Sequence, residues 1–486
     1  MDKNFKKNLI KGVSATSIGQ IATLVIYFVT TIILARELNT VNFGEFALIL
    51  AIAGILQLFS SLGLDSTLIK FISDDTDEKS YFFLKLLSIK VISLIIISII
   101  FIIISKIFVL FDPKINSYTF YIILIFLLSS LRDFFNSQLV GLRKFRSYVY
   151  VQVITALFKL IAYISCFLLN LLDLNFLVYV EISTLLFSFI LQQILSPIKY
   201  SFKLGISAKD LKEIFIFSYP LYFNSVLQYA NNSLNNFIIA GYLGTISLAQ
   251  YSVAEKIPSA ITKLYGSFII VFFPNISLLF NKNKLEDATD LINKTISALN
   301  TLIAPLILFT FMFKDQLVVL LFSEKYLSSS FPFFLLVTVI YFRSVSAITG
   351  YSIVAKGKTF HSFINNFGST IVGLSLAFIL TPKYGIEGAV YSIFISRLLS
   401  ALGGILMLRS YSLRIKLIPV FYPIILSLIF IWLYNTLFIS NIIIGIGLFI
   451  LFIIIQFWLF KDFRGLIKEV LSIIKHSFSR IILRRN

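Results

Sequence analysis

Apolar stretches of roughly 20 residues recur along the whole chain, and they constrain its fold more than any other feature. A helix rises about 1.5 Å per residue, so about 20 residues cross the roughly 30 Å of hydrocarbon in a bilayer. Runs such as 91–104 and 442–460 do not alternate in polarity, as the strands of a membrane barrel would. Only 13% of the residues are charged, against about a quarter in soluble domains. The sequence therefore predicts an all-α integral membrane protein.

The apolar stretches predict about fourteen transmembrane helices. Their expected ranges are 13–35, 43–64, 83–104, 118–140, 148–169, 176–197, 214–240, 248–272, 295–313, 332–353, 362–381, 386–408, 417–437 and 441–460. The basic N-terminus leads into a first stretch that is too long for the apolar region of a signal peptide. The single cysteine, Cys166, allows no intrachain disulfide and indicates no redox role.

The basic residues predict the orientation of these helices. Because Lys and Arg are in excess in cytoplasmic loops, the basic face marks the cytoplasm. Most of the 42 Lys and Arg residues fall on the same side as the N-terminus, and the opposite side holds only Arg36, Lys106, Lys114, Lys314, Lys325 and Lys383. We therefore expect both termini in the cytoplasm. The net charge of +19 then reflects topology and contact with anionic lipids, and nucleic-acid binding is not needed to explain it.

Two short matches indicate that the chain contains a repeated half. Residues 38–47 resemble residues 243–252, and residues 143–147 resemble 358–362, at similar offsets. The matches predict two pseudo-symmetric six-helix lobes and a C-terminal pair. The expected parts are an N-lobe over 1–198, a cytoplasmic linker over 199–213, a C-lobe over 214–409, an extra pair over 410–460 and a basic tail over 461–486. Apolar residues recur every three to four positions in the tail, which indicates an amphipathic helix on the membrane surface. We expect the tail to anchor the chain to the membrane surface, and docking of a partner is the alternative role.

Ionisable side chains at bilayer depth are the first candidates for a functional site. Each costs about 2.5–3.5 kcal/mol to insert, so their presence needs a compensating function or partner. The cations near the middle of their helices are Arg132, Lys159, Lys263, Arg343 and Arg397, and the carboxylates within the helices are Asp133, Glu181 and Glu255. The excess of cations predicts a wet, electropositive cavity that binds an anionic substrate. Structural ion pairs, or cations that reach to the interface, are the alternative for each residue. The three carboxylates are candidates for ion coupling or gating.

Amide side chains at helical spacing are the second group of candidates. They include Gln20 in the first predicted helix and Asn224, Gln228, Asn231 (or Asn232) and Asn235 in the seventh. Such a face offers both donors and acceptors to the hydroxyl groups of a sugar. Hydrogen bonds between helices are the alternative role. Glu255 is followed closely by Pro258, which interrupts the helix and is typical of a gate or coupling-ion site.

Seven segments of the chain resemble those of a known family: 35–38, 43–47, 62–64, 219–221, 241–244, 251–254 and the turn 381–389. Together they span about residues 12–410. The family that they resemble is the Wzx-type O-antigen and polysaccharide flippases of the multidrug/oligosaccharidyl-lipid/polysaccharide (MOP) exporter superfamily. The turn Thr381–Ala389 is the most specific of them. None marks a catalytic group, and no sodium-site motif is found.

The resemblance implies alternating access between two lobes in the bacterial cytoplasmic (inner) membrane. It also implies a substrate of sugars on undecaprenyl pyrophosphate and a role in polysaccharide or O-antigen (lipopolysaccharide) assembly. Anionic lipids and other polysaccharide-assembly proteins are further expected partners. A lipid II flippase and a drug antiporter of the same superfamily are the nearest alternatives. An antiporter would be expected to favour cationic substrates, against the excess of cations predicted here.

An enzyme is a more distant alternative. A polysaccharide polymerase or ligase would carry a long external loop with sugar-binding residues, and no such loop is found in the sequence. No glycine-rich phosphate loop and no cluster of metal ligands is present either. We therefore expect a transporter without catalytic residues, metal or cofactor.

Overall fold

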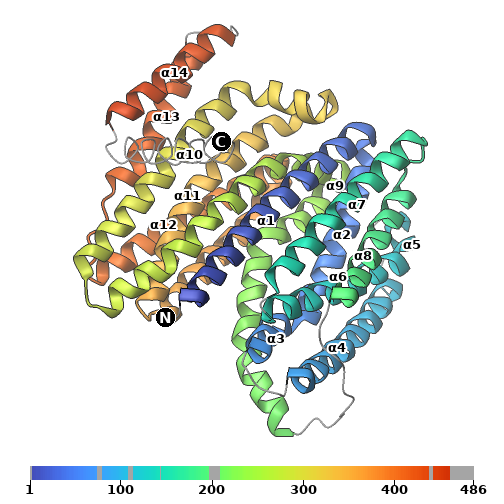
Figure 1. Cartoon of the computed structure of the whole chain (residues 1–486). Coiled ribbons are helices and arrows are strands. Elements are labelled where there is room, and N and C mark those ends of the chain that lie inside the picture. The colour runs from blue at the N-terminus through green and yellow to red at the C-terminus, as the bar shows by residue number, and fades with distance from the viewer. Residues whose placement is uncertain are drawn as a thin grey trace, which may run out of the picture. The chain divides into compact units, whose positions relative to one another are not determined.

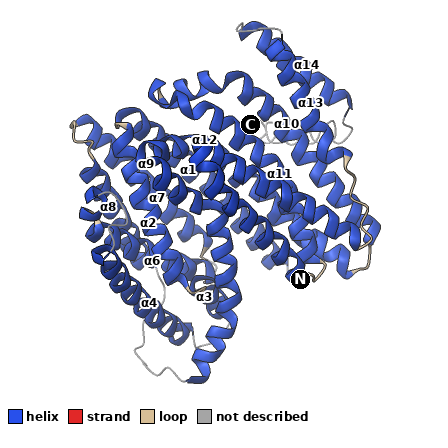
Figure 2. Cartoon of the chain, turned by 180° about the vertical axis from the view of Figure 1, so that it is seen from behind, coloured by secondary structure: helices blue, strands red, loops and turns tan. Residues whose placement is uncertain are grey.

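A computed structural model describes residues 3–73, 79–107, 113–142, 144–195, 208–436 and 442–459, and these residues form helices joined by short loops (Figures 1 and 2). The helices are α1 (Lys3–Glu37), α2 (Thr40–Ser61), α3 (Leu64–Ser73), α4 (Lys79–Ile107), α5 (Pro113–Ser117), α6 (Thr119–Gly141), α7 (Phe145–Leu168), α8 (Leu174–Leu195), α9 (Ala208–Asn281), α10 (Leu285–Phe322), α11 (Ser330–Ala355), α12 (Thr359–Ser410), α13 (Ile418–Thr436) and α14 (Ile442–Leu459), with a 3₁₀ helix η1 (Glu324–Ser329). The predicted tail over 461–486 lies outside the described residues.

Eleven helical segments among the described residues are long and apolar enough to cross a membrane. The helices α9 and α12 are each interrupted by one glycine, Gly244 (φ 80°) and Gly385 (φ 62°). Backbone in this left-handed region favours glycine because a Cβ atom is strained there. These glycines fall between the predicted spans 214–240 and 248–272, and between 362–381 and 386–408. The helix α14 is a shorter apolar helix. The count of fourteen and the cytoplasmic position of both termini stay predictions.

The chain forms two compact units, Met1–Ser252 and Val253–Asn486. In the first unit α1 packs on α7, and α6 packs on α2, α3 and α8. A core cluster joins α3, α4, α6 and the start of α9, and it consists of Leu64, Leu68, Ile72, Phe83, Leu86, Phe134, Phe135 and Ile214. The division into lobes and linker that the sequence predicts is not tested by these contacts and stays a prediction.

The helices α2 and α9 cross closely in the first unit because Gly44 has no side chain. A Cβ atom built on Gly44 of α2 would lie 1.9 Å from the carbonyl oxygen of Thr245 in α9, whereas one built on Gly241 would meet nothing within 4 Å. A backbone atom cannot move aside by rotating about a bond, as a side chain can. A Cβ atom at position 44 would therefore force the two helices apart. We expect Gly44→Ala to destabilise the protein by about 3 kcal/mol, and Gly241→Ala to be neutral or slightly stabilising. Thermal unfolding of the purified variants measures the difference, and equal midpoints would contradict the crossing.

In the second unit, buried side chains bind the entry to α13 to its neighbours. Asn300 of α10 donates to the carbonyl oxygen of Pro419 (3.1 Å), and the hydroxyl of Tyr341 in α11 donates to that of Val420 (2.7 Å). Asn293 of α10 donates to the carbonyl oxygen of Arg414 (3.1 Å). The carbonyl oxygen of Pro419 would otherwise lack a partner within the helix, because Pro423 of α13, four residues on, has no N–H group to donate. The helix α13 is therefore fixed to α10 and α11 as part of one unit.

Candidate functional site

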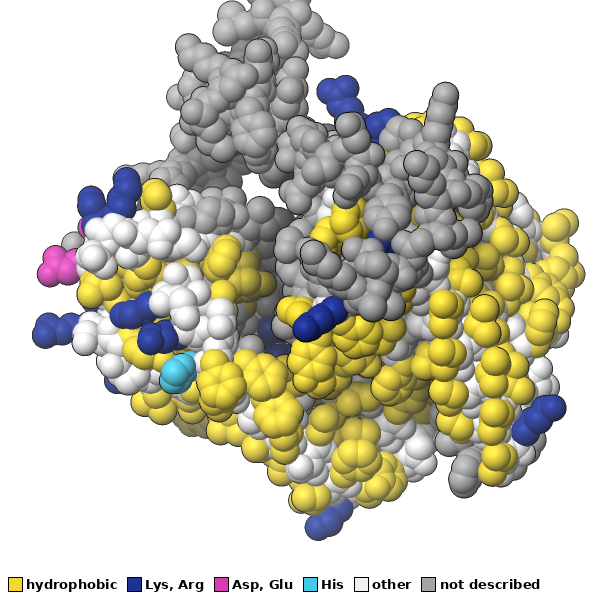
Figure 3. Space-filling view, turned by 90° about the horizontal axis from the view of Figure 1, so that it is seen from below, with side chains coloured by type: hydrophobic (Ala, Val, Ile, Leu, Met, Phe, Trp, Pro, Cys, Tyr) yellow, Lys and Arg dark blue, Asp and Glu magenta, His cyan; other side chains and the backbone are white. Residues whose placement is uncertain are grey.

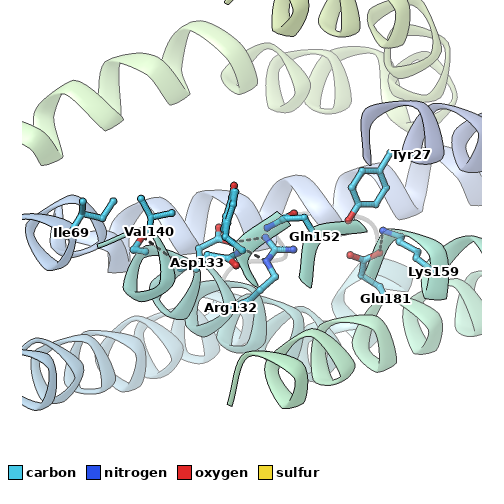
Figure 4. Close-up of a pocket in the computed structure, with 11 residues that line it drawn as sticks. Tyr27, Ile69, Arg132, Asp133, Val140, Gln152, Lys159 and Glu181 are labelled. Carbon is cyan, nitrogen blue, oxygen red and sulfur yellow. Dashed lines mark hydrogen bonds and ion pairs between the residues drawn. The ribbon is translucent and has the colours of Figure 1, made fainter. Parts of the chain in front are cut away.

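The first unit contains an open, polar cavity of about 580 Å³. Its walls come from α1, α3, α6, α7 and α8 (Figure 4). The lining residues are Tyr27, Ile69, Arg132, Asp133, Asn136, Ser137, Val140, Tyr148, Gln152, Lys159 and Glu181. Four of the predicted site residues, Arg132, Lys159, Asp133 and Glu181, are brought together here from three different helices. The cavity is therefore the leading candidate for a functional site in the first unit.

Arg132 and Asp133 form an ion pair on the cavity wall. The Nη2 and Nε atoms of Arg132 each lie 2.8 Å from Oδ1 of Asp133. The other carboxylate oxygen of Asp133 accepts a hydrogen bond from Nε2 of Gln57 in α2 (2.6 Å). The arginine and aspartate side chains nevertheless remain 29% and 38% exposed. Because the pair is only partly desolvated, an anion that enters the cavity can reach the guanidinium group.

The side-chain amide of Gln192 in α8 binds the segment of α6 that carries this ion pair. Its Nε2 donates to the backbone carbonyl of Arg132 (2.9 Å) and to Oδ1 of Asn136 (2.9 Å), and the Gln192 side chain is buried. These bonds hold the middle of α6 against α8. The arginine is thereby presented to the cavity from a fixed backbone.

Lys159 and Glu181 form the second ion pair, between α7 and α8. These side chains are 15% and 10% exposed, so they are more deeply buried than the first pair. The ammonium group of Lys159 also lies 5.6 Å from the ring centre of Tyr27 and 5.9 Å from that of Tyr163. Figure 4 shows Tyr27 directed toward this pair. An aromatic face attracts a cation, so the lysine is held by a carboxylate and two rings together.

The charges around this cavity balance, with two cations and two carboxylates in two pairs. The cation excess inferred from the whole chain is therefore not seen in this wall. Pairing is the expected ground state at bilayer depth, because an unpaired charge there is costly. Substrate contact by Arg132 and Lys159, and ion coupling by Asp133 and Glu181, stay predictions.

A third ion pair lies near the cavity and was not predicted. Lys90 of α4 is fully buried, and its Nζ lies 3.6 Å from Oδ1 of Asp65 in α3. Burial raises the pKa of the Asp65 carboxyl, while the charge of Lys90 acts to lower it. Asp65 directly follows the end of a predicted span, so its position in sequence indicated a loop. Its spacing of four residues from Ile69, a cavity residue, is the signal that places both on one face of a helix.

The second unit contains a separate group of predicted charges. Glu255 of α9 experiences the charges of Lys256, Arg343 and Lys263. Arg343 of α11 is half-buried and Lys263 is exposed. Arg397 of α12 is half-buried as well, and no interaction between it and Glu255 is found in the described part of the chain. The structure thus brings Arg343 and Lys263 toward one carboxylate, and their functional roles stay predictions.

The predicted amide stripes are only partly described. Gln20 lies exposed on α1, and Asn235 is buried in α9 with an Oδ1 atom that has no hydrogen-bond partner among the described residues. The side chains of Asn224, Gln228, Asn231 and Asn232 lie outside the described part of the structure. The amides found around the first ion pair are instead Gln57 and Gln192, which the sequence analysis did not single out. Helical spacing of Gln192 from Ser188 and Glu181 on α8 was the available signal.

Comparison with known sequences decides the family. The family described as "Polysaccharide biosynthesis protein" matches residues 33–331, which is more than half of the chain. The chain belongs to this family. Among similar proteins, a probable low-salt glycan biosynthesis flippase of Haloferax volcanii is 25% identical over 366 residues, which cover 73% of this chain and 74% of the relative. An uncharacterised membrane protein of Methanocaldococcus jannaschii is 25% identical over 436 residues, 79% of this chain and 81% of the relative.

Solved structures of membrane transport proteins have the same fold as this chain. A lipid II flippase, MurJ, in an inward closed conformation has a TM-score of 0.72 at 16% identity, over 93% of this chain and 99% of that one. An inward-facing multidrug resistance MATE family transporter of the MOP superfamily has a TM-score of 0.68 at 14% identity, over 82% and 98%. The predicted all-α, multi-pass membrane fold is therefore confirmed.

Proposed function

We propose that this chain is a flippase that moves an undecaprenyl-pyrophosphate-linked oligosaccharide across the cytoplasmic membrane. The observation that carries the proposal is the family match over 33–331, because this range includes the charged residues of the cavity. The name of the Haloferax relative, a glycan biosynthesis flippase, supports the same class of activity. The chain acts as a transporter in this account and supplies no catalytic group.

The substrate class follows from the cations of the cavity. Arginine and lysine bind phosphate oxygens through charge-assisted hydrogen bonds, and arginine can do so with two parallel bonds. In this proposal a pyrophosphate replaces Asp133 as the partner of Arg132 and replaces Glu181 as the partner of Lys159. The neutral side chains Gln152, Asn136 and Ser137 offer hydrogen bonds to the first sugars. The exchange of partners lets the site hold an anion without a permanent excess of buried charge.

Ion coupling follows from the carboxylates that the substrate displaces. If Glu181 and Asp133 are left without cations in the cavity, protonation or a bound cation must neutralise them. An ion gradient would therefore drive the exchange of ion-pair partners. In the second unit, Glu255 would be the carboxylate that is neutralised when the substrate replaces it as the partner of Lys263 and Arg343. Alternating access would move the lobes 1–198 and 214–409, joined by the linker 199–213, around the substrate. Anionic lipids and other polysaccharide-assembly proteins are the further partners in this proposal.

A lipid II flippase is the second candidate function, and the similarity of fold to MurJ favours it. Lipid II is also a pyrophosphate-linked sugar, so the same exchange of ion pairs would serve it. A drug antiporter, which the MATE fold supports, would instead need a site for an organic cation. The match to the polysaccharide biosynthesis family argues against this third candidate.

Complementation separates the two flippase candidates. We expect the chain to restore surface polysaccharide to a strain that lacks its own polysaccharide flippase. It should not restore growth to a strain depleted of its lipid II flippase. The opposite pair of results would assign the lipid II activity, and failure in both strains at normal membrane levels would contradict the proposed function.

A further inference from the structure

Basic and aromatic side chains meet on the second unit at the start of α12. Nζ of Lys356 donates to the carbonyl oxygen of Tyr411 (3.0 Å) and lies 5.3 Å from the ring centre of that tyrosine and 5.8 Å from that of Phe280. The ring of His361 meets the Tyr411 ring edge-on at 5.9 Å. Lys358, which lies between Lys356 and His361 in the sequence, is exposed. We call Lys356, Lys358 and His361 the basic end.

In the part of the chain that the structure describes, no carboxylate balances the positive charge of the basic end. Among the described residues neither Lys356 nor Lys358 forms an ion pair with an acidic side chain. Between Lys325 and Lys461 the sequence contains a single carboxylate side chain, Glu387. The pKa of Lys356 is lowered, first by burial and then by repulsion from Lys358. An anion bound here would relieve that repulsion.

An exposed row of aromatic rings leads away from the basic end along α12. Phe360, Phe363 and Phe367 follow one another at helical spacing, with ring centres 6.4 Å and 5.6 Å apart and planes within 19° and 15° of parallel. They are 67%, 38% and 43% exposed. We call them the aromatic ladder. Phe360 also contacts the ring of His361 (6.5 Å), so the ladder is continuous with the basic end.

The space-filling view also shows basic and apolar side chains next to one another. His361 is the one histidine in the part of the chain that the structure describes. Figure 3 shows this histidine beside Lys or Arg side chains and beside hydrophobic side chains on one face. A ligand that covers this face must therefore be anionic at one end and apolar along its length.

We propose that this face is a binding site for an anionic glycerophospholipid. The phosphate group would bind to Lys356, Lys358 and His361, and one acyl chain would lie along the aromatic ladder. A soluble anion such as free phosphate satisfies the basic end alone and leaves the ladder uncovered. A lipid satisfies both, because hydrocarbon is the natural neighbour of exposed rings in a membrane helix and basic groups next to it attract anionic headgroups. The site belongs to the second unit alone, and the proposal does not depend on the proposed transport activity.

The test is lipid retention by the purified full-length protein, measured by native mass spectrometry with phosphatidylglycerol and phosphatidylcholine in equal amounts. We expect preferential retention of phosphatidylglycerol. The double variant Lys356→Gln/Lys358→Gln should weaken its binding by about 30-fold, since each basic residue near anionic headgroups contributes on the order of 1 kcal/mol. The matched control is Lys383→Gln, which removes the same charge from an exposed position further along α12 and should leave retention unchanged.

Two single variants keep the test decisive if the double variant does not fold. Lys358→Gln alters an exposed side chain and should weaken phosphatidylglycerol binding by about fivefold. Phe360→Ala removes the most exposed ring of the ladder and should weaken binding of both lipids, whereas added inorganic phosphate should displace neither. Equal retention of the two lipids by the wild-type protein would overturn the proposal. So would a loss in Lys383→Gln as large as that in Lys358→Gln.

Discussion

Replacing Lys159 with glutamine is expected to reduce export of surface glycan by about 10- to 100-fold. A hydrogen bond to a charged group contributes about 1.5–3 kcal/mol, and in our proposal the ammonium group of Lys159 makes such a bond to the pyrophosphate during transport. The measurement is surface polysaccharide in a complemented strain, normalised to the amount of the variant in the membrane. Lys159→Arg keeps the charge and should retain part of the activity.

The Lys159 variant needs a control for folding, because it also leaves Glu181 without its partner. Removing one member of a buried ion pair costs about 3–5 kcal/mol, since the other charge is then uncompensated. The double variant Lys159→Gln/Glu181→Gln replaces both charges with amides of similar size. We expect it to restore membrane levels and thermal stability but not export. Normal export by the double variant would show that the pair serves only the fold.

Neutralising Arg343 is the second variant for which we expect a large effect. Arg343 is half-buried in α11, and its charge acts on Glu255 of α9. Arg343→Gln would weaken the neutralisation of Glu255 and, in our proposal, remove a phosphate contact of the second unit. We expect surface glycan to fall by at least about tenfold at a normal membrane level of the protein.

Two further variants are needed to interpret the effect of Arg343→Gln on glycan export. Arg343→Lys retains the charge but loses the paired geometry of the guanidinium group, so we expect an intermediate level of export. Arg343→Gln/Glu255→Gln removes both charges and separates a substrate role from a role in pairing. If Arg343→Gln lowers the amount of protein in the membrane in proportion to export, the arginine is structural and the assignment to the substrate fails.

The sequence predicted the elements of the fold well because the membrane imposes a simple rule on them. A helix must be apolar and about 20 residues long to span hydrocarbon, and both properties are visible without tertiary contacts. The breaks at Gly244 and Gly385 were predicted within a few residues for a related reason. At these positions the chain needs a left-handed backbone, and glycine is the residue that accepts it. Each of these features is local in sequence.

The partners of the charged residues could not be predicted in the same way. Lys159 pairs with Glu181 from the next helix, and Asp133 accepts a hydrogen bond from Gln57, which is 76 residues away. Which helix faces meet depends on packing, and periodicity within a single helix does not determine it. A count of charges over the whole chain indicated an excess of cations, whereas the cavity of the first unit contains equal numbers of each sign. Asp65 was missed because it directly follows the end of a predicted span.

The central claim is that this chain itself moves a pyrophosphate-linked glycan across a bilayer. The most direct measurement uses the purified protein in lipid vesicles that contain a fluorescently labelled undecaprenyl-pyrophosphate sugar in both leaflets, with a membrane-impermeant reductant that destroys the dye irreversibly added outside. We predict that the reductant removes nearly all of the fluorescence in vesicles with the wild-type protein, and only the outer half in vesicles with the Lys159→Gln/Glu181→Gln variant. Loss of only the outer half with the folded wild-type protein, under an imposed ion gradient of either direction, would contradict the account.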